Sequence, residues 1–68
     1  MKLHVELLPS GERKIMKFPD KANGFDVVDA LDLKPDAYLL VRDGQPIPMD
    51  ELLKSGDRIK LIKVASGG

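Results

Sequence analysis

The chain has 68 residues, in which 11 Lys and Arg balance 11 Asp and Glu, and it contains no cysteine. A chain of this length forms one small domain and needs nearly all its apolar residues for one core, which argues against a deep substrate cleft. The missing cysteine excludes disulfides, thiolate metal sites and a cysteine nucleophile, and the balanced charge argues against a nucleic-acid partner.

Two extended runs open the chain. Residues 2–8 alternate polar and apolar side chains, the pattern of a strand with one buried face. A turn sequence at 9–12 leads into a second run over 13–18, in which we expect Ile15 to point away from the core. Two such runs joined by a short glycine-containing turn predict a β-hairpin.

One helix is predicted over residues 26–33. Asp26 is a suitable N-cap, Asp29 lies three residues further on as in a capping box, and Phe25 stands where a hydrophobic staple would be. Pro35 ends the helix because a proline disfavours the helical conformation of the residue before it.

The second half of the chain contains three further extended segments. Residues 37–42 predict a strand that is apolar on both faces and is followed by a tight turn. Residues 45–48 predict a short strand, which its two prolines confine to a sheet edge. After a helical turn at 49–53, residues 58–64 predict the last strand.

This order predicts an α+β domain over residues 1–64, in which one main helix packs on one face of a mixed four- to five-stranded sheet. Residues 65–68 are expected to form a flexible C-terminal tail. The apolar residues that we assign to the core are Leu3, Val5, Leu7, Met16, Phe18, Val27, Leu31, Leu39, Val41, Ile59 and Leu61.

No group of residues forms a recognisable catalytic or metal-binding motif. His4, the single histidine, falls on the polar side of a strand, and its position pairs it with no nucleophile or carboxylate. The acidic residues do not follow calcium-loop spacing, and the Ser-Gly pairs lack the further glycines and the lysine of a phosphate-binding loop. We therefore expect neither an enzyme nor a protein that binds a cofactor or metal.

The start of the chain lacks the continuous apolar run of a signal peptide, and no stretch is apolar over a membrane-spanning length. We therefore expect a cytoplasmic protein with no membrane partner, monomeric when free.

The sequence ends in Gly67-Gly68, directly after a strand and a two-residue spacer. Two such glycines arise by chance in roughly half a percent of cases, at an average glycine usage of about 7%. A terminal carboxylate that must enter a narrow channel in an activating enzyme needs conformational freedom and no neighbouring side chains, and glycine provides both. A frayed end or a chance occurrence is the alternative explanation.

Three segments carry a family resemblance together with the order of elements. They are Val-Arg-Asp-Gly-Gln-Pro-Ile-Pro at 41–48, Ser-Gly-Asp-Arg-Ile at 55–59 and Ser-Gly-Gly at 66–68. Through them the whole chain resembles the ubiquitin-like β-grasp family, in particular the sulfur carriers ThiS and MoaD and the small archaeal modifier proteins. The tail lacks the prolines common in MoaD and has two glycines where ThiS often has three, so the resemblance leaves the pathway open.

The resemblance implies that an E1-like adenylating enzyme uses ATP and Mg²⁺ to activate the Gly68 carboxylate, with Gly67 beside it. A sulfur donor would then give a thiocarboxylate for cofactor or tRNA thiolation, or a second route would give an isopeptide bond to a target lysine. The nucleotide, the metal and any cysteine would belong to the partner. A sulfur-acceptor enzyme or a target protein would act downstream.

Strand alternation predicts where a partner would dock. It places Ile59 and Leu61 in the core. Because Arg42 is expected to be exposed, Leu39 and Val41 are assigned inward, which leaves Tyr38 and Leu40 outward. An apolar patch rimmed by basic side chains is therefore expected on the open sheet face, and such patches mark partner sites. A register shifted by one residue would bury the patch. The predicted partner-binding residues are Leu40, Ile62, Val64, Arg58 and Lys60.

Three functions fit this sequence: a sulfur carrier, a modifier conjugated to lysines, and a β-grasp interaction module that is never activated. The diglycine end separates the module from the first two, because a binding module has no need of it. No feature of the sequence separates carrier from modifier.

Overall fold

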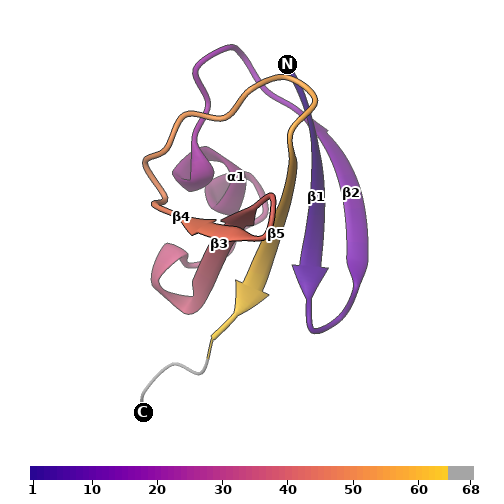
Figure 1. The fold of residues 1–68 in the computed structure, drawn as a ribbon, viewed down its shortest axis with the longest axis vertical. Helices are drawn as coiled ribbons and strands as arrows, with labels where there is room; N and C mark the ends of the chain where they lie inside the picture. The colour runs from indigo at the N-terminus through magenta and orange to yellow at the C-terminus, as the bar shows by residue number, and fades with distance from the viewer. Residues whose placement is uncertain (65–68) are drawn as a thin grey trace.

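The first and last strands pair in parallel at the centre of a five-stranded mixed sheet of order β2-β1-β5-β3-β4 (Figure 1). The computed structural model describes residues 1–64. The elements are β1 (Lys2–Leu8), β2 (Glu12–Lys17), α1 (Gly24–Ala30), the 3₁₀ helix η1 (Pro35–Ala37), β3 (Tyr38–Arg42), β4 (Gln45–Ile47) and β5 (Arg58–Lys63). The predicted hairpin, the single main helix and the proline-containing edge strand are confirmed.

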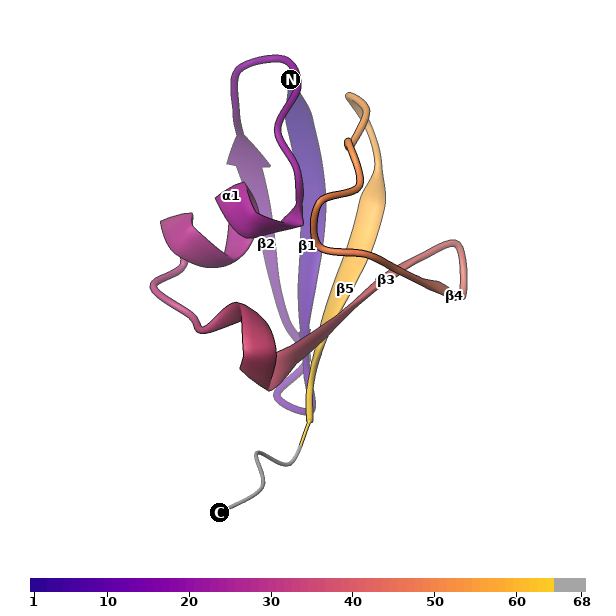
Figure 2. The same cartoon turned by 90° about the vertical axis from the view of Figure 1, so that its left-hand side faces the viewer.

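The core lies between α1 and the sheet face that this helix covers (Figure 2). Burial of these apolar side chains supplies the main driving force for folding, about 1.5–3 kcal/mol for each large side chain. Five of the predicted core residues are fully buried: Leu3, Val5, Val27, Ile59 and Leu61. Four others, Leu7, Met16, Phe18 and Leu31, are partly buried and pack against this cluster. Within residues 1–64, four buried hydrophobic residues were not predicted: Ala22, Val28, Leu40 and Leu53.

The predicted orientation of β3 is wrong by one residue. Leu40, expected outward, is 1% exposed and lies opposite the core residue Leu61. Leu39, expected in the core, is 41% exposed and lies opposite Ile62 on the open face. Val41 is buried as expected, but it shares that open face with Leu39. β3 is apolar on both faces, so alternation alone could not orient it.

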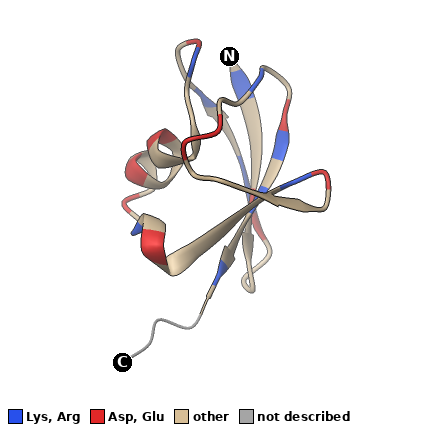
Figure 3. Cartoon of the chain, turned by 60° about the vertical axis from the view of Figure 1, so that its left-hand side comes forward, with Lys and Arg blue, Asp and Glu red and all other residues tan. Residues whose placement is uncertain are grey.

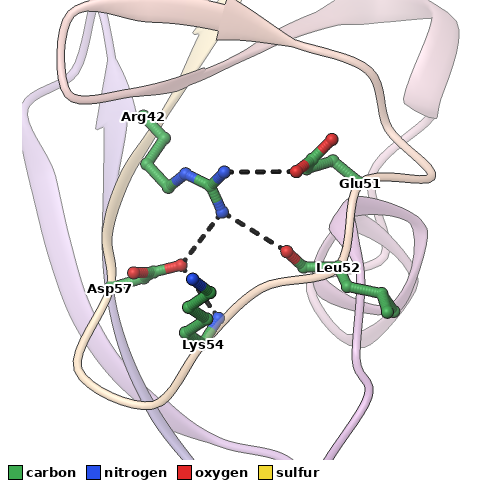
Figure 4. Close-up of polar contacts among 5 residues, drawn as sticks. All are labelled: Arg42, Glu51, Leu52, Lys54 and Asp57. Carbon is green, nitrogen blue, oxygen red and sulfur yellow. Dashed lines mark hydrogen bonds and ion pairs between the residues drawn. The ribbon is translucent and has the colours of Figure 1, made fainter.

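Arg42 explains the error. Its side chain lies on the sheet face that α1 covers, where it forms hydrogen bonds to the loop between β4 and β5 (Figure 4). Its Nη1 donates to Asp57 Oδ2 at 3.2 Å and to the Leu52 carbonyl at 3.3 Å. Its Nη2 donates to Glu51 Oε2 at 3.2 Å. The Asp57 carboxylate also accepts from the Lys54 amide at 2.9 Å. The guanidinium group therefore has a structural role where sequence reasoning assumed a solvated charge.

The helix begins earlier than predicted, at an asparagine in place of an aspartate. Asn23 Oδ1 accepts from the Asp26 amide at 3.1 Å, and Asp26 Oδ2 accepts from the Asn23 amide at 2.8 Å. This reciprocal pair is a capping box with Asn23 as N-cap and Asp26 as the third helical residue. Asn and Asp are about equally good N-caps, so local sequence could not choose between them. Phe25 is consequently 47% exposed and is not a staple.

Gly24 allows the first turn of α1 to pack directly on the sheet. A Cβ at this position would lie 2.6 Å from Leu40 Cδ2 and 2.9 Å from the Met49 carbonyl oxygen. Phe25 N donates to that same carbonyl at 3.2 Å. Only glycine therefore fits where the helix start meets β3 and the chain after β4.

Two smaller expectations are also corrected. The predicted helical turn at 49–53 is a turn closed by Glu51 N donating to the Pro48 carbonyl at 3.1 Å, followed by a bridge between Leu52 and Asn23. The third strand starts at Tyr38, one residue later than expected, because residues 35–37 form η1. Within residues 1–64, the helices are too short and too polar for any of them to cross a membrane.

A matched pair of variants tests which side chains of β3 face the core. Leu40→Ala should lower the free energy of unfolding by about 2–5 kcal/mol, because it removes a fully buried side chain and leaves a cavity. Leu39→Ala, one residue away, should cost less than about 1 kcal/mol. Urea unfolding followed by circular dichroism measures both, and the reverse order of the two losses would contradict this register.

Candidate functional site

The sheet face opposite α1 presents most of the side chains that the sequence assigned to partner binding. Strand alternation and register place the odd-numbered residues of β2 and the even-numbered residues of β1 and β5 on this open face. Its charged residues are mostly basic: Lys2, Arg13, Lys17, Arg58 and Lys60, with Glu6 among them. These five basic residues are called the basic face below.

Next to the basic face lies an apolar patch that consists of Leu8, Leu39, Ile62 and Val64. Ile62 pairs with Leu8 on one side and with Leu39 on the other, so three apolar side chains form one row across three strands. Leu39 is 41% exposed and Val64 is 38% exposed. Exposed apolar side chains grouped in this way favour contact with another protein.

The predicted site residues are largely brought together. Arg58, Lys60, Ile62 and Val64 lie on the open face as expected, whereas Leu40 is in the core and its place in the patch is taken by Leu39. Their binding of a partner stays a prediction. Leu8 was missed, because only its pairing with Ile62 shows that the end of β1 reaches the patch. The remaining two predicted residues, Gly67 and Gly68, lie outside the described residues, as does the predicted flexible tail.

The basic half of the open face is hollowed into a groove of about 530 Å³ over β2, β1 and β5. Glu6, one of its lining residues, forms an ion pair with Arg13, with 3.7 Å between Glu6 Oε2 and Arg13 Nε, and lies beside Lys60 in the register. The residues that line the groove are His4, Val5, Glu6, Arg13, Lys14, Ile15, Arg58, Ile59 and Lys60. Such a groove, rich in fixed positive charge, attracts an anionic surface.

The charges of the whole chain are segregated between two regions (Figure 3). Residues 1–17 and 58–64, which contain β1, β2 and β5, carry seven Lys and Arg against two Glu, a side-chain charge of +5. Residues 18–57 carry four Lys and Arg against nine Asp and Glu, a charge of −5. The zero net charge of the sequence therefore conceals two oppositely charged regions, and the argument from balanced charge does not describe the folded surface.

The end of β5 is fixed beside the apolar patch. The Val64 amide donates to the Ala37 carbonyl at 2.9 Å, which ties the last described residue to the end of η1, directly before β3. The end of β5 lies at the end of the sheet remote from the N-terminus (Figure 1). Four residues follow Val64 in the sequence. A fully extended chain of that length spans at most about 14 Å.

Comparison with known proteins identifies the family of this chain. A sequence model of the small archaeal modifier protein 2 family matches residues 1–65. The chain belongs to this family. An uncharacterised protein of Archaeoglobus fulgidus is 24% identical over all 68 residues of both chains.

Solved structures share the fold, which is the ubiquitin-like β-grasp that the resemblance implied. The crystal structure of SAMP1 from Haloferax volcanii matches with a TM-score of 0.76 at 19% identity, with both chains fully covered. The complex of subunits 1 and 2 of the molybdopterin-converting factor from Helicobacter pylori contains a chain that matches at 0.70 and 21% identity, again over both full lengths.

Within residues 1–64, no three acidic or histidine side chains gather closely enough to hold a metal ion. The same residues present a charged and partly apolar sheet face. The absence of a bound cofactor stays a prediction.

The repulsion between two lysines on the open face can be tested. Lys2 and Lys17 lie directly opposite each other on β1 and β2, and like charges in that position repel. Lys17→Glu should turn this repulsion into attraction and raise the free energy of unfolding by about 0.2–1 kcal/mol. Urea unfolding at low and high salt measures the gain, which should shrink as salt screens the pair. A loss of stability at low salt would contradict the register of the hairpin.

Proposed function

We propose that this chain is a ubiquitin-like carrier whose Gly68 carboxylate is adenylated by an E1-like enzyme. The carboxylate attacks the α-phosphate of ATP, pyrophosphate leaves, and an acyl-adenylate forms. A carboxylate is a poor electrophile. In the acyl-adenylate its carbon can be attacked by a nucleophile, because AMP is a good leaving group. A sulfur donor that displaces AMP leaves a thiocarboxylate, and a lysine amine that displaces it leaves an isopeptide bond.

The observation that carries the proposal is the position of Val64. This residue belongs to the apolar patch and also precedes the last four residues of the sequence. A partner seated on the patch therefore lies within about 14 Å of chain from the carboxylate. The hydrogen bond from the Val64 amide to the Ala37 carbonyl holds this starting point in place, so a partner that recognises the patch is brought close to the carboxylate.

The division of labour follows from what the chain contributes. The β-grasp domain offers a recognition face, and the two glycines offer a carboxylate with no side chain beside it. The nucleotide site, Mg²⁺ and any nucleophilic cysteine belong to the adenylating partner in this proposal. The chain is then a substrate and carrier of that enzyme, not a catalyst.

Two fates of the activated carboxylate are supported by different observations. Membership of a modifier family supports conjugation to lysines. The shared fold with a chain of the molybdopterin-converting factor supports sulfur delivery. Intact mass of the protein from its native cells distinguishes them, because the carrier shows one oxygen replaced by sulfur and the modifier appears in conjugates. Neither form in those cells would favour an interaction module that is never activated.

Removal of Gly68 should abolish activation and leave the thermal unfolding curve unchanged. The attacking carboxylate oxygen must lie within about 3–3.5 Å of the α-phosphorus of ATP, and the loss of one residue withdraws the carboxylate by up to about 3.6 Å. ATP–pyrophosphate exchange with the adenylating enzyme measures activation. Equal exchange by the full-length and shortened proteins would contradict both the sulfur-carrier and the modifier hypotheses.

Leu39→Glu should weaken binding to the adenylating enzyme at least tenfold while the protein stays folded. The new carboxylate is solvated in the free protein but is desolvated against the apolar surface of the partner. The control is Leu52→Glu in the loop between β4 and β5, where the side chain is 55% exposed and lies outside the patch. Titration calorimetry measures both, and equal affinities would exclude the patch as the docking site.

A further inference from the structure

We infer that the basic face docks on an acidic surface of the adenylating partner. The partner then contacts two adjoining areas of this chain, one basic and one apolar. This inference rests on the proposed function and names the chemistry of the partner surface. The apolar patch is one area, and the groove and its basic rim over β1, β2 and β5 are the other. An interface of this kind has an apolar part and a charged part that steers association and sets orientation.

The first support is the segregation of charge. Residues 1–17 and 58–64, which contain β1, β2 and β5, carry a side-chain charge of +5, and residues 18–57 carry −5 (Figure 3). The separation of these positive and negative charges leaves the net charge at zero but gives the protein a dipole. A dipole orients the approaching molecule, and its basic end meets an acidic partner face first.

The second support is that part of this charge opposes folding. Lys2 and Lys17 are directly opposite in the hairpin register, where like charges destabilise the pair. Within residues 1–64, Lys17, Arg58 and Lys60 form no ion pair, whereas Arg42 is fully used inside the fold. A lysine pair that costs stability, together with further basic side chains that form no ion pair within residues 1–64, fits a surface that an acidic partner neutralises.

The third support concerns the class of partner. Single-stranded nucleic acid is normally held by aromatic side chains on which bases stack. The three aromatic residues here lie elsewhere: Phe18 and Tyr38 pack against the core, and Phe25 is on α1. Glu6 also stands within the basic face, where it would repel phosphates but could set the register of a protein interface. The adjoining apolar patch likewise fits a protein.

The test compares two double variants that change the net charge equally. Lys17→Glu with Arg58→Glu alters the basic face, and Lys21→Glu with Lys34→Glu alters residues outside the three basic strands. The affinity of the full chain for its adenylating enzyme is measured by titration calorimetry at several salt concentrations. Thermal unfolding confirms that both variants fold.

We expect the basic-face variant to bind at least tenfold more weakly near 0.1 M salt, and the control variant within about twofold of the parent protein. The difference should nearly vanish near 1 M salt, where charges are screened over about 3 Å. Equal weakening by both variants, or no weakening by the first, overturns the inference. The proposed function is judged separately, because pyrophosphate exchange with the parent protein reports activation whatever the variants do.

A transfer RNA transcript is the competing probe. Fluorescence anisotropy should show no difference in its binding between the parent protein and the basic-face variant. If the transcript binds the parent and loses at least tenfold in affinity with the variant, while enzyme affinity is unchanged, the basic face binds RNA and the inference is overturned.

Discussion

The structure depends on one pairing, in which the last strand enters the sheet between the first strand and the third. β5 runs parallel to β1 and antiparallel to β3, so residues more than 50 positions apart in the chain become neighbours. This central strand supplies two fully buried core residues, Ile59 and Leu61. Without it, the hairpin and the β3–β4 pair are two separate ribbons with no shared core, and isolated ribbons of that size are marginal in water.

The same pairing creates the candidate site. Alternate residues of β5 face the solvent, and each stands beside a residue of β1, of β3 or of both. Ile62 thereby joins Leu8 and Leu39 into one apolar row, while Arg58 and Lys60 join the basic residues of the hairpin into one charged surface. The strand that completes the core also places Val64 beside that surface. In the proposed function, folding, recognition and the approach of the carboxylate to the partner are thus linked through the six residues of β5.

The two faces of the sheet show how a small domain divides its residues between stability and recognition. One face is apolar and covered by α1, where the capping box and the absence of a side chain at Gly24 let the helix pack closely. The other face keeps exposed apolar side chains and a repelling lysine pair, neither of which favours folding. A domain of 68 residues has about 3–10 kcal/mol of net stability, so such features need a compensating role. The partner binding proposed above would supply such a role.

Residue pattern alone determined the element order, the hairpin, the edge position of β4 and most of the core, because amphipathic periodicity and turn chemistry are local properties. It could not orient β3, since that strand is apolar on both faces and its one polar guide, Arg42, is held by Glu51 and Asp57 from a loop far along the chain. Charge balance likewise concealed the basic face, because residues 2–17 and 58–63 become one surface only when their strands pair. What the sequence by itself determined is therefore which segments form strands and which forms the helix. Only the tertiary structure decided which side chains face outward together, because that depends on contacts between segments that are distant in the chain.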